Sequence, residues 1–319
     1  MKLGRYAVAT DPGRRRRRNE DAYLVEPPLF AVADGMGGAQ AGEVASRLAA
    51  GALREGGTSE LDALIQEANR RVHQRAAEDP EASGMGTTMT VALVEASVVR
   101  FGHVGDSRAY LIRDGKLEQV TQDHSLVGEL VRSGKLSPEE AGRHPQRSVI
   151  TRAVGTDPDV DVDTFTVESQ ESDLFLICSD GLTDMVDDET IERLVGKKRD
   201  DLDGLVKSLV KTANRGGGED NITVVAFEIA ADGAELEETA VVPPRAGDAE
   251  PDEEDTLTEL DRVPAVDTMV VSVDEVAAAS PDTPPKPRRR RFLSRLLAFL
   301  IVIALLFGVA FLILWGLAA

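Results

Sequence analysis

Hydrophobic and polar positions over the first 230 residues follow two periods, one typical of strands and one typical of helices. Short apolar runs and period-two alternation predict strands. These fall at 3–11, 22–25, 29–33, 87–94, 97–104, 108–113, 116–120, 149–154, 160–167, 174–179 and 222–229. Apolar residues at helical spacing predict helices at 41–54, 61–77 and 202–213. The polar stretch 123–147, which contains Gly134 and two prolines, predicts a small helical excursion from a sheet; we call it the excursion.

The order of these elements favours one fold class. Consecutive strands are joined by short turns, and Asp114-Gly115 between two of them is a typical hairpin signal. The helices are grouped rather than placed after each strand, as a doubly wound parallel sheet would require. The pattern therefore predicts an α+β fold with antiparallel sheets.

The pattern changes after residue 230. Residues 231–285 are rich in Asp, Glu, Pro, Ala and Thr and lack aromatic residues, which predicts a disordered linker. Residues 286–295 form a basic cluster, and 296–317 are apolar and uncharged. A membrane-spanning helix needs about 20 apolar residues, so we expect 296–317 to cross the lipid bilayer. The positive-inside rule would place the arginines, and the folded domain, in the cytoplasm. The expected location is the cell membrane, with a single span.

Composition narrows the remaining possibilities. A chain of 319 residues can form one large or two modest domains. A net charge of −20 argues against general binding to nucleic acid. The single cysteine, Cys178, excludes an internal disulfide and is expected to be a core thiol. Lys2, Arg5 and Asp11 interrupt any apolar core of an amino-terminal signal peptide, so we expect none.

Candidate chemistry comes from acids placed at the ends of apolar runs. Asp34 and Asp180 follow such runs, and Asp21 and Asp220 precede them. Carboxylates in these places, with no lysines beside them, are suited to bind hard divalent cations. Arg14 to Arg18 form a basic run next to Asp21; alone it would indicate a solvated loop or a nucleic-acid patch. Beside a metal site, arginine is also the side chain that holds phosphate.

Six motifs occur in an order that resembles a known family. They are Arg16-x-x-Asn19-Glu20-Asp21, Asp34-Gly35-Met36-Gly37-Gly38, Gly86-Thr87-Thr88, Gly105-Asp106-Ser107-Arg108-Ala109, Ser179-Asp180-Gly181-Leu182 and Glu219-Asp220-Asn221-Ile222-Thr223. In this order they are similar to the metal-dependent (PPM) serine/threonine protein phosphatases, in their bacterial branch. The resemblance covers residues 1–230 and implies a four-layer α-β-β-α sandwich of two antiparallel sheets flanked by paired helices.

The resemblance also implies a site with two Mn²⁺ or Mg²⁺ ions and room for a third. Asp34 would bridge the two ions, and Arg16 would bind the substrate phosphate. The other implied ligands are Asp21, Asp180, Asp220, the Gly35 carbonyl, Glu20 through water, and Asp106 with Ser148 for the third ion. Two close cations lower the pKa of a bound water and neutralise phosphoryl oxygens, so that no covalent intermediate is needed.

One position departs from many eukaryotic members of the family. They have histidine after the Asp-Gly pair, as general acid toward the leaving alcohol. Here the residue is Met36, which cannot donate a proton, as in the bacterial branch. A metal-bound water near Asp106 is the expected replacement. We expect structural roles for the histidines, which are His73, His103, His124 and His144.

The resulting functional hypothesis is hydrolysis of phosphoserine and phosphothreonine on proteins by a monomeric enzyme that opposes serine/threonine kinases. One alternative is a phosphatase for an anti-sigma-factor antagonist, which the generic motif set and the lack of a sensor domain disfavour. Another is a catalytically inactive, membrane-tethered phosphoprotein-binding module. That alternative predicts a lost metal ligand, and the motifs retain every one.

Overall fold

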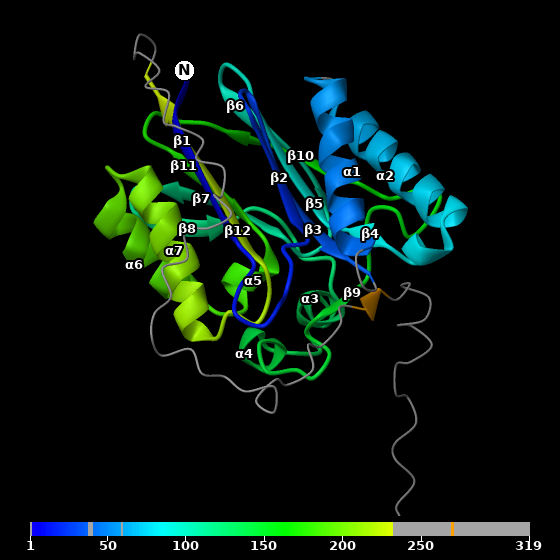
Figure 1. The fold of residues 1–319 in the computed structure, drawn as a ribbon. Helices are drawn as coiled ribbons and strands as arrows, with labels where there is room; N and C mark the ends of the chain where they lie inside the picture. Colours follow the sequence, from blue (N-terminus) through cyan, green and yellow to red (C-terminus); the bar gives the residue numbers. More distant parts are fainter. Residues whose placement is uncertain (1, 38–40, 59, 232–268, 271–319) are drawn as a thin grey trace, which may run out of the picture. The chain divides into compact units, whose positions relative to one another are not determined.

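The computed structural model describes residues 2–37, 41–58, 60–231 and 269–270, and these form two sheets with helices outside them (Figure 1). The first sheet has the order β1-β12-β11-β7-β8, and the second β10-β6-β5-β3-β2, with β4 paired to β3. All pairs in these two sheets are antiparallel. The first sheet consists of β1 (Lys2–Asp11), β7 (Arg108–Arg113), β8 (Lys116–Gln119), β11 (Leu174–Cys178) and β12 (Ile222–Ala230). The second consists of β2 (Asp21–Glu26), β3 (Leu29–Met36), β4 (Gly86–Thr87), β5 (Met89–Val94), β6 (Val98–Val104) and β10 (Asp163–Glu168).

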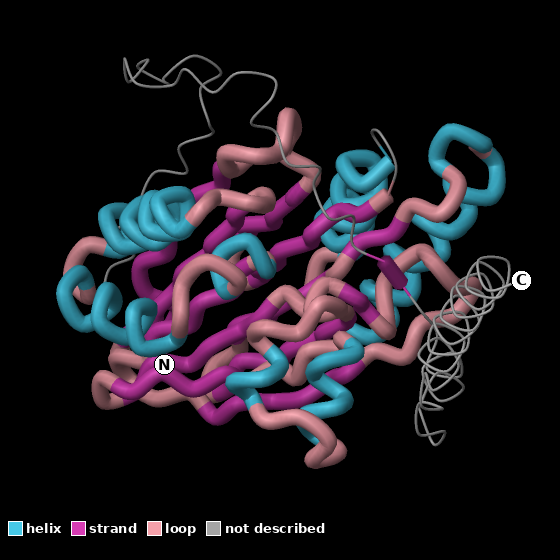
Figure 2. Tube along the Cα trace, turned by 90° about the horizontal axis from the view of Figure 1, so that it is seen from below, coloured by secondary structure: helices cyan, strands magenta, loops and turns pink. Residues whose placement is uncertain are grey.

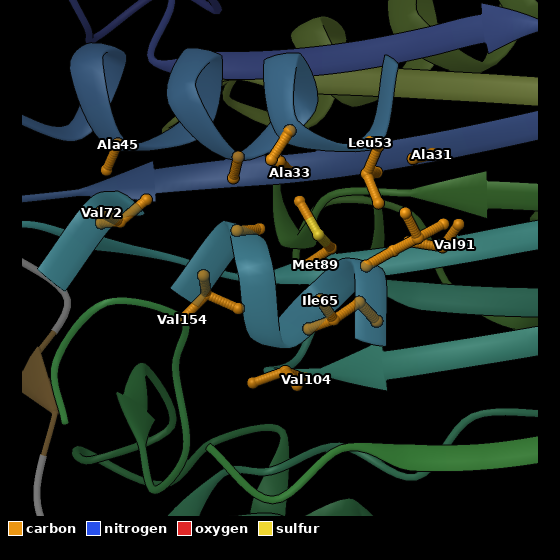
Figure 3. Packing of buried hydrophobic residues seen from close by; sticks show 14 of the residues in the cluster. Ala31, Ala33, Ala45, Leu53, Ile65, Val72, Met89, Val91, Val104 and Val154 are labelled. Atoms are coloured by element: carbon orange, nitrogen blue, oxygen red, sulfur yellow. The ribbon is translucent and has the colours of Figure 1, made fainter. Parts of the chain in front are cut away.

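Each sheet has its own pair of helices on its outer face. The helices α1 (Ala41–Gly56) and α2 (Leu61–Glu78) cover the second sheet, and α6 (Asp188–Lys198) and α7 (Leu202–Gly216) cover the first. Figure 3 shows the former contact, where Leu53 and Ile65 from the two helices meet Met89 and Val91 of β5. The short helix η1 (Pro80–Ala82) follows α2.

A third apolar cluster joins the inner faces of the two sheets. Phe30 of β3 stacks on Phe227 of β12 with ring centroids 4.5 Å apart, and Phe175 of β11 stacks on the same ring at 5.2 Å. All three rings are fully buried. Seen from below, the strands of both sheets run through the middle of the domain with helices on the outside (Figure 2). The predicted α+β class with two antiparallel sheets is therefore confirmed.

Several predicted elements differ in extent from the observed ones. The strand predicted at 29–33 continues through Asp34 to Met36, because Gly35 and Met36 pair with Thr87 and Gly86. The strand predicted at 149–154 is reduced to β9 (Val149–Ile150). Helix α6 is absent from the sequence-based prediction, although Asp187 caps its first turn and Ile191 and Val195 form its buried side. The short α5 (Asp180–Thr183) was also missed.

The excursion holds two short helices, as its polar pattern predicts. They are α3 (Leu126–Arg132) and α4 (Pro138–Ala141), and neither has a buried residue. Within the range predicted to be a disordered linker, β13 (Met269–Val270) pairs in parallel with β9. The rest of that linker, the basic cluster and the predicted span at 296–317 lie outside the described residues. Among the described residues, no helix is both long and apolar enough to span a bilayer.

Candidate metal and phosphate site

The predicted aspartates are brought together from both sheets. Asp21 of β2 and Asp34 of β3 are direct partners in the antiparallel register. Asp180 begins α5 directly after β11, and Asp220 lies two residues before β12. Asp106 lies in the turn between β6 and β7. The residues come from five segments between β2 and β12, and the pairing of neighbouring strands places them at one end of the two sheets.

The aspartate carboxyls raise one another's pKa values. Burial raises the pKa of Asp34 well above its usual value, and the charges of Asp21, Asp180, Asp220 and Asp106 raise it further. Burial likewise raises the pKa of Asp180 well above its usual value. Such a cluster is costly to ionise unless cations compensate it.

The pKa values of Asp21 and Asp106 also rise, each to about 7, and burial is the first cause for both. The other charges that raise them come from Asp220 for Asp21, and from Asp123 and Asp184 for Asp106. Hydrogen bonds from Thr223 and Ser179 offset part of the rise at Asp21.

The donor set fits divalent cations. Three buried carboxylate oxygens, Oδ1 of Asp21, Asp106 and Asp180, have no hydrogen-bond partner among the described residues. Buried polar atoms are normally satisfied, so these oxygens are available to a ligand. As the side chains lie here, the described residues contain no ready-made group of three acidic, histidine or cysteine side chains that would hold an ion. The Asp34 carboxyl nevertheless offsets part of the pKa rise at Asp21 and Asp180.

The backbone around Asp34 is held by a threonine pair. Thr88 Oγ1 accepts a hydrogen bond from the Asp34 N–H at 3.0 Å, and Thr87 Oγ1 donates to the Asp34 carbonyl at 2.8 Å. Next along the chain, a Cβ at Gly35 would lie 2.1 Å from the Gly42 carbonyl oxygen of α1. Only glycine allows this approach of the helix to the strand. Glu20 is close to the same contact, since its carboxylate would be 2.6 Å from a Cβ at Gly42.

Arg16 is the half-buried member of the arginine run, and its four neighbours are exposed. Its Nη2 donates to Asp220 Oδ2 at 2.8 Å. Burial opposes its charge, but Asp220, Glu20 and Asp34 together raise the pKa of Arg16. Its Nε is buried without a partner among the described residues. The residue that the motif spacing selects is thus the arginine that faces the carboxylates.

A cavity of about 840 Å³ opens beside these carboxylates. Asp106 and Asp180 line it, and so do Val127 and Val131 of α3. Arg147 of the excursion is also on the wall, where it pairs with Asp184 at 3.2 Å. The predicted third-ion residue Ser148 is half-buried and is not among the described residues that line this cavity. The assignment of Ser148 to a third ion stays a prediction.

The five aspartates and Arg16 lie within a region that matches a known protein family. Residues 14–220 match the model of the protein phosphatase 2C family. The chain belongs to the protein phosphatase 2C family.

Relatives in this family match the whole folded domain. The serine/threonine phosphatase stp of Listeria innocua is 42% identical over 236 residues, which are 69% of this chain and 93% of the relative. The crystal structure of the Mycobacterium tuberculosis serine/threonine phosphatase PstP/Ppp is 40% identical, with a TM-score of 0.69 over 72% of this chain and 100% of the other. A structure of the PstP catalytic domain in complex with two manganese ions is 38% identical, with a TM-score of 0.66 over 72% and 99% of the two chains.

Some supporting residues of this phosphatase 2C domain were quoted in the motifs but given no role by sequence reasoning. Asn221 accepts from the Glu20 N–H at 2.7 Å and donates to the carbonyls of Pro12 and Arg18, so it ties the arginine run to the Asp220 segment. Ser179 Oγ donates to Asp21 Oδ2 at 2.9 Å and joins the two sheets. The sequence feature that could have identified Asn221 and Ser179 is their position directly beside Asp220 and Asp180 in the motifs.

Proposed function

We propose that this chain is a protein-serine/threonine phosphatase that hydrolyses phosphoserine and phosphothreonine with two, and at one further position a third, Mn²⁺ or Mg²⁺ ions. The observation that carries the proposal is the convergence of five aspartates at one end of the two sheets, and four of them, Asp21, Asp34, Asp106 and Asp180, have raised pKa values. Several buried acids with a single arginine beside them destabilise a protein, and bound divalent ions supply the missing charge.

Each of these residues would bind the ions in a different position. Asp34, buried at the centre, would bridge two of them, and Asp21, Asp180, Asp220 and the Gly35 carbonyl would complete the set, with Glu20 acting through water. Asp106 would serve the third position. When bound, such ions lower the pKa of a coordinated water and stabilise charge on the phosphoryl oxygens.

The chain's own groups bind and orient the substrate. Arg16 presents planar N–H donors beside Asp220, the geometry that suits phosphate oxygens. In this arrangement the phosphate would replace one carboxylate contact of Arg16. The cavity next to Asp106 and Asp180 offers apolar walls from α3 and space for the peptide that carries the phosphate. Met36 is buried against Ile150 and Ala153 and supplies no proton, so the leaving alcohol must take its proton from water.

We further propose that the domain acts as a monomer at the cytoplasmic face of the cell membrane, anchored by 296–317, and opposes serine/threonine kinases. This rests on the apolar run and the basic cluster before it. Fractionation of cells that express the full chain tests the location. Recovery of the protein in the soluble fraction, with an intact carboxy terminus, would contradict it.

The activity is tested by release of phosphate from a phosphothreonine peptide, with and without Mn²⁺. We expect turnover that needs the metal and that is absent after chelation. Binding of the peptide without release of phosphate would instead support an inactive binding module. A phosphorylated anti-sigma-factor antagonist, offered in competition with the peptide, tests the narrower substrate class.

A further inference from the structure

His124 encloses the backbone of Gly105, the residue directly before Asp106. Its own N–H donates to the Gly105 carbonyl at 2.7 Å, and its ring Nδ1 accepts from the Gly105 N–H at 3.0 Å. His124 therefore satisfies both backbone polar groups of Gly105, the carbonyl through its own N–H and the N–H through its ring. His124 is only 3% exposed, so these bonds are shielded from water.

The other end of His124 reaches the segment that follows the excursion. Its carbonyl accepts from the Thr151 N–H at 2.8 Å, and its Nε2 lies 3.2 Å from Asp163 Oδ2 on β10. Arg152 donates to the other oxygen of Asp163 at 2.6 Å. His124 thus joins the Asp106 turn, the start of the excursion and the chain just after it.

The protonation state of the ring follows from these partners. A backbone N–H can only donate, so Nδ1 must present its lone pair to Gly105. Burial, helped by the nearby charge of Arg152, lowers the pKa of His124 and keeps the ring neutral. The single ring proton then lies on Nε2, where Asp163 Oδ2 at 3.2 Å accepts it; Arg152 Nη1, which can only donate, also lies 3.1 Å from Nε2.

The place of the Asp106 carboxylate depends on this backbone. Asp106 is buried and its Oδ1 has no partner among the described residues, so no side chain holds that oxygen. Gly105 has φ +110°, and a Cβ there would lie 2.6 Å from Thr88. The turn is therefore tightly packed on the Thr88 side and closed by His124.

We propose that His124 is a positioning residue that sets the Asp106 carboxylate through the backbone of Gly105 and couples it to the excursion. The role toward a metal ion rests on the proposed function, whereas the hold on Gly105 does not.

Two substitutions separate the two ends of the ring. In His124→Asn the amide oxygen stands where Nδ1 was and retains the acceptor for Gly105, and the contact with Asp163 is lost. In His124→Gln the amide reaches toward Asp163, and the acceptor for Gly105 is lost. Asp163→Asn and His103→Gln are the matched controls, because they change the outer partner and the neighbouring buried ring, 4.7 Å away, without touching Gly105.

The first measurement is hydrogen exchange of the Gly105 amide in the full-length protein in chelator, relative to core amides of β12. We expect about tenfold faster exchange in His124→Gln, the effect of one lost buried hydrogen bond. His124→Asn and both controls should stay near wild type. In the same series, the Mn²⁺ concentration for half-maximal activity should rise in His124→Gln and be restored in His124→Asn.

Equal exchange in the Asn and Gln variants would overturn the proposal. Should both variants fail to fold, ¹⁵N NMR of histidine-labelled wild type decides, because each ring tautomer has its own nitrogen shifts. A His124 ring protonated on Nδ1 at neutral pH would refute the acceptor role. If the wild type released no phosphate, the proposed function would fail while exchange and tautomer still tested His124.

Discussion

The aspartate cluster and the excursion meet at the same cavity but are held in different ways. Asp21 and Asp34 are fixed by strand register, and the carboxyls around them are buried. The two helices of the excursion have no buried residue. Arg147 ties the excursion to Asp184 and Glu219 by ion pairs whose side chains are between 34% and 56% exposed.

For the proposed function, this difference would separate the residues that hold the ions from the segment that controls access to them. Regions with few buried apolar contacts open locally at low free-energy cost, while core strands open only with the whole domain. Asp21 and Asp34, which lie in paired strands, therefore belong to the part of the fold that opens least readily. Asp106 lies at the boundary, on the strand side but closed by His124 from the excursion.

The largest effect is expected from Asp34→Asn, which tests the aspartate cluster held by the strands. We expect loss of activity with the fold retained, because the substitution removes the bridging charge and also relieves repulsion among buried acids. Mn²⁺ should raise the Tm of the wild type by linkage and raise that of the variant little. Thermal melts and peptide assays with and without Mn²⁺ measure both effects. Substantial activity of the variant at saturating Mn²⁺ would refute the bridging role.

Arg16→Ala tests the phosphate contact beside the cluster. A charge-assisted hydrogen bond contributes about 1.5–3 kcal/mol, which is roughly a ten- to hundredfold loss in kcat/KM. We expect most of this loss in kcat/KM to come from a higher KM, and Arg16→Lys should recover part of it. Arg15→Ala and Arg17→Ala are matched controls, since both side chains are exposed. A larger loss at either control would show that the motif register is shifted.

The cluster also predicts an unusual pH dependence of the metal-free protein. The pKa of Asp21 and Asp106 is about 7 in the folded state, against the ordinary aspartate value of 3.8, so between these limits the folded state binds more protons than the unfolded state. The free energy of unfolding in chelator should therefore be highest below about pH 4 for these groups and fall as pH rises through 7. Denaturant titrations at pH 5 and pH 8 measure it. Mn²⁺ should remove the decline, and a rise in stability toward pH 8 without metal would contradict the burial of these acids.

Arg147→Ala tests the excursion side and should have a small effect. Exposed ion pairs contribute about 0.2–1 kcal/mol each, so global stability should change little. Arg113→Ala is the contrasting variant, because its partner Asp173 is buried at 1% exposure. We expect the greater loss of stability in Arg113→Ala, measured by denaturant midpoint. The reverse order would mean that the excursion stabilises the whole domain.

The smallest effect is expected from truncation after residue 231. The motifs all lie before this point, so turnover of a small phosphopeptide should stay near that of the full chain, in a soluble monomer. The truncation also removes β13 from its pairing with β9, next to the excursion. A large loss of turnover would show that this pairing supports the site.

Sequence reasoning predicted most of the fold because burial repeats at regular periods. The strands around Phe30 and Phe175 are continuous apolar runs, and α7 has a clear apolar stripe. Helix α6 was missed because its pattern is short and largely polar, with only Ile191 and Val195 buried. The excursion was placed, but its contacts were not, because its position depends on ion pairs and on His124 rather than on periodicity.

The candidate site was predicted at the level of residue types and motif order. The structure adds the contact of Arg16 with Asp220 and the hydrogen bonds by which Asn221 and Ser179 hold the segments that carry the carboxylates. These contacts join segments up to about two hundred positions apart, as in the bond between Glu20 and Asn221, for which |i−j| is 201. No local pattern encodes such contacts, so only the folded arrangement reveals them.

The burial of the chain's single thiol bears on whether its activity withstands oxidants. Cys178 is fully buried in β11, and burial raises its pKa to about 12. The thiolate is the form that peroxide and alkylating agents attack. An enzyme with this arrangement has no reactive sulfur nucleophile to lose, so it should continue to remove phosphate under peroxide concentrations that silence phosphatases built on a catalytic cysteine.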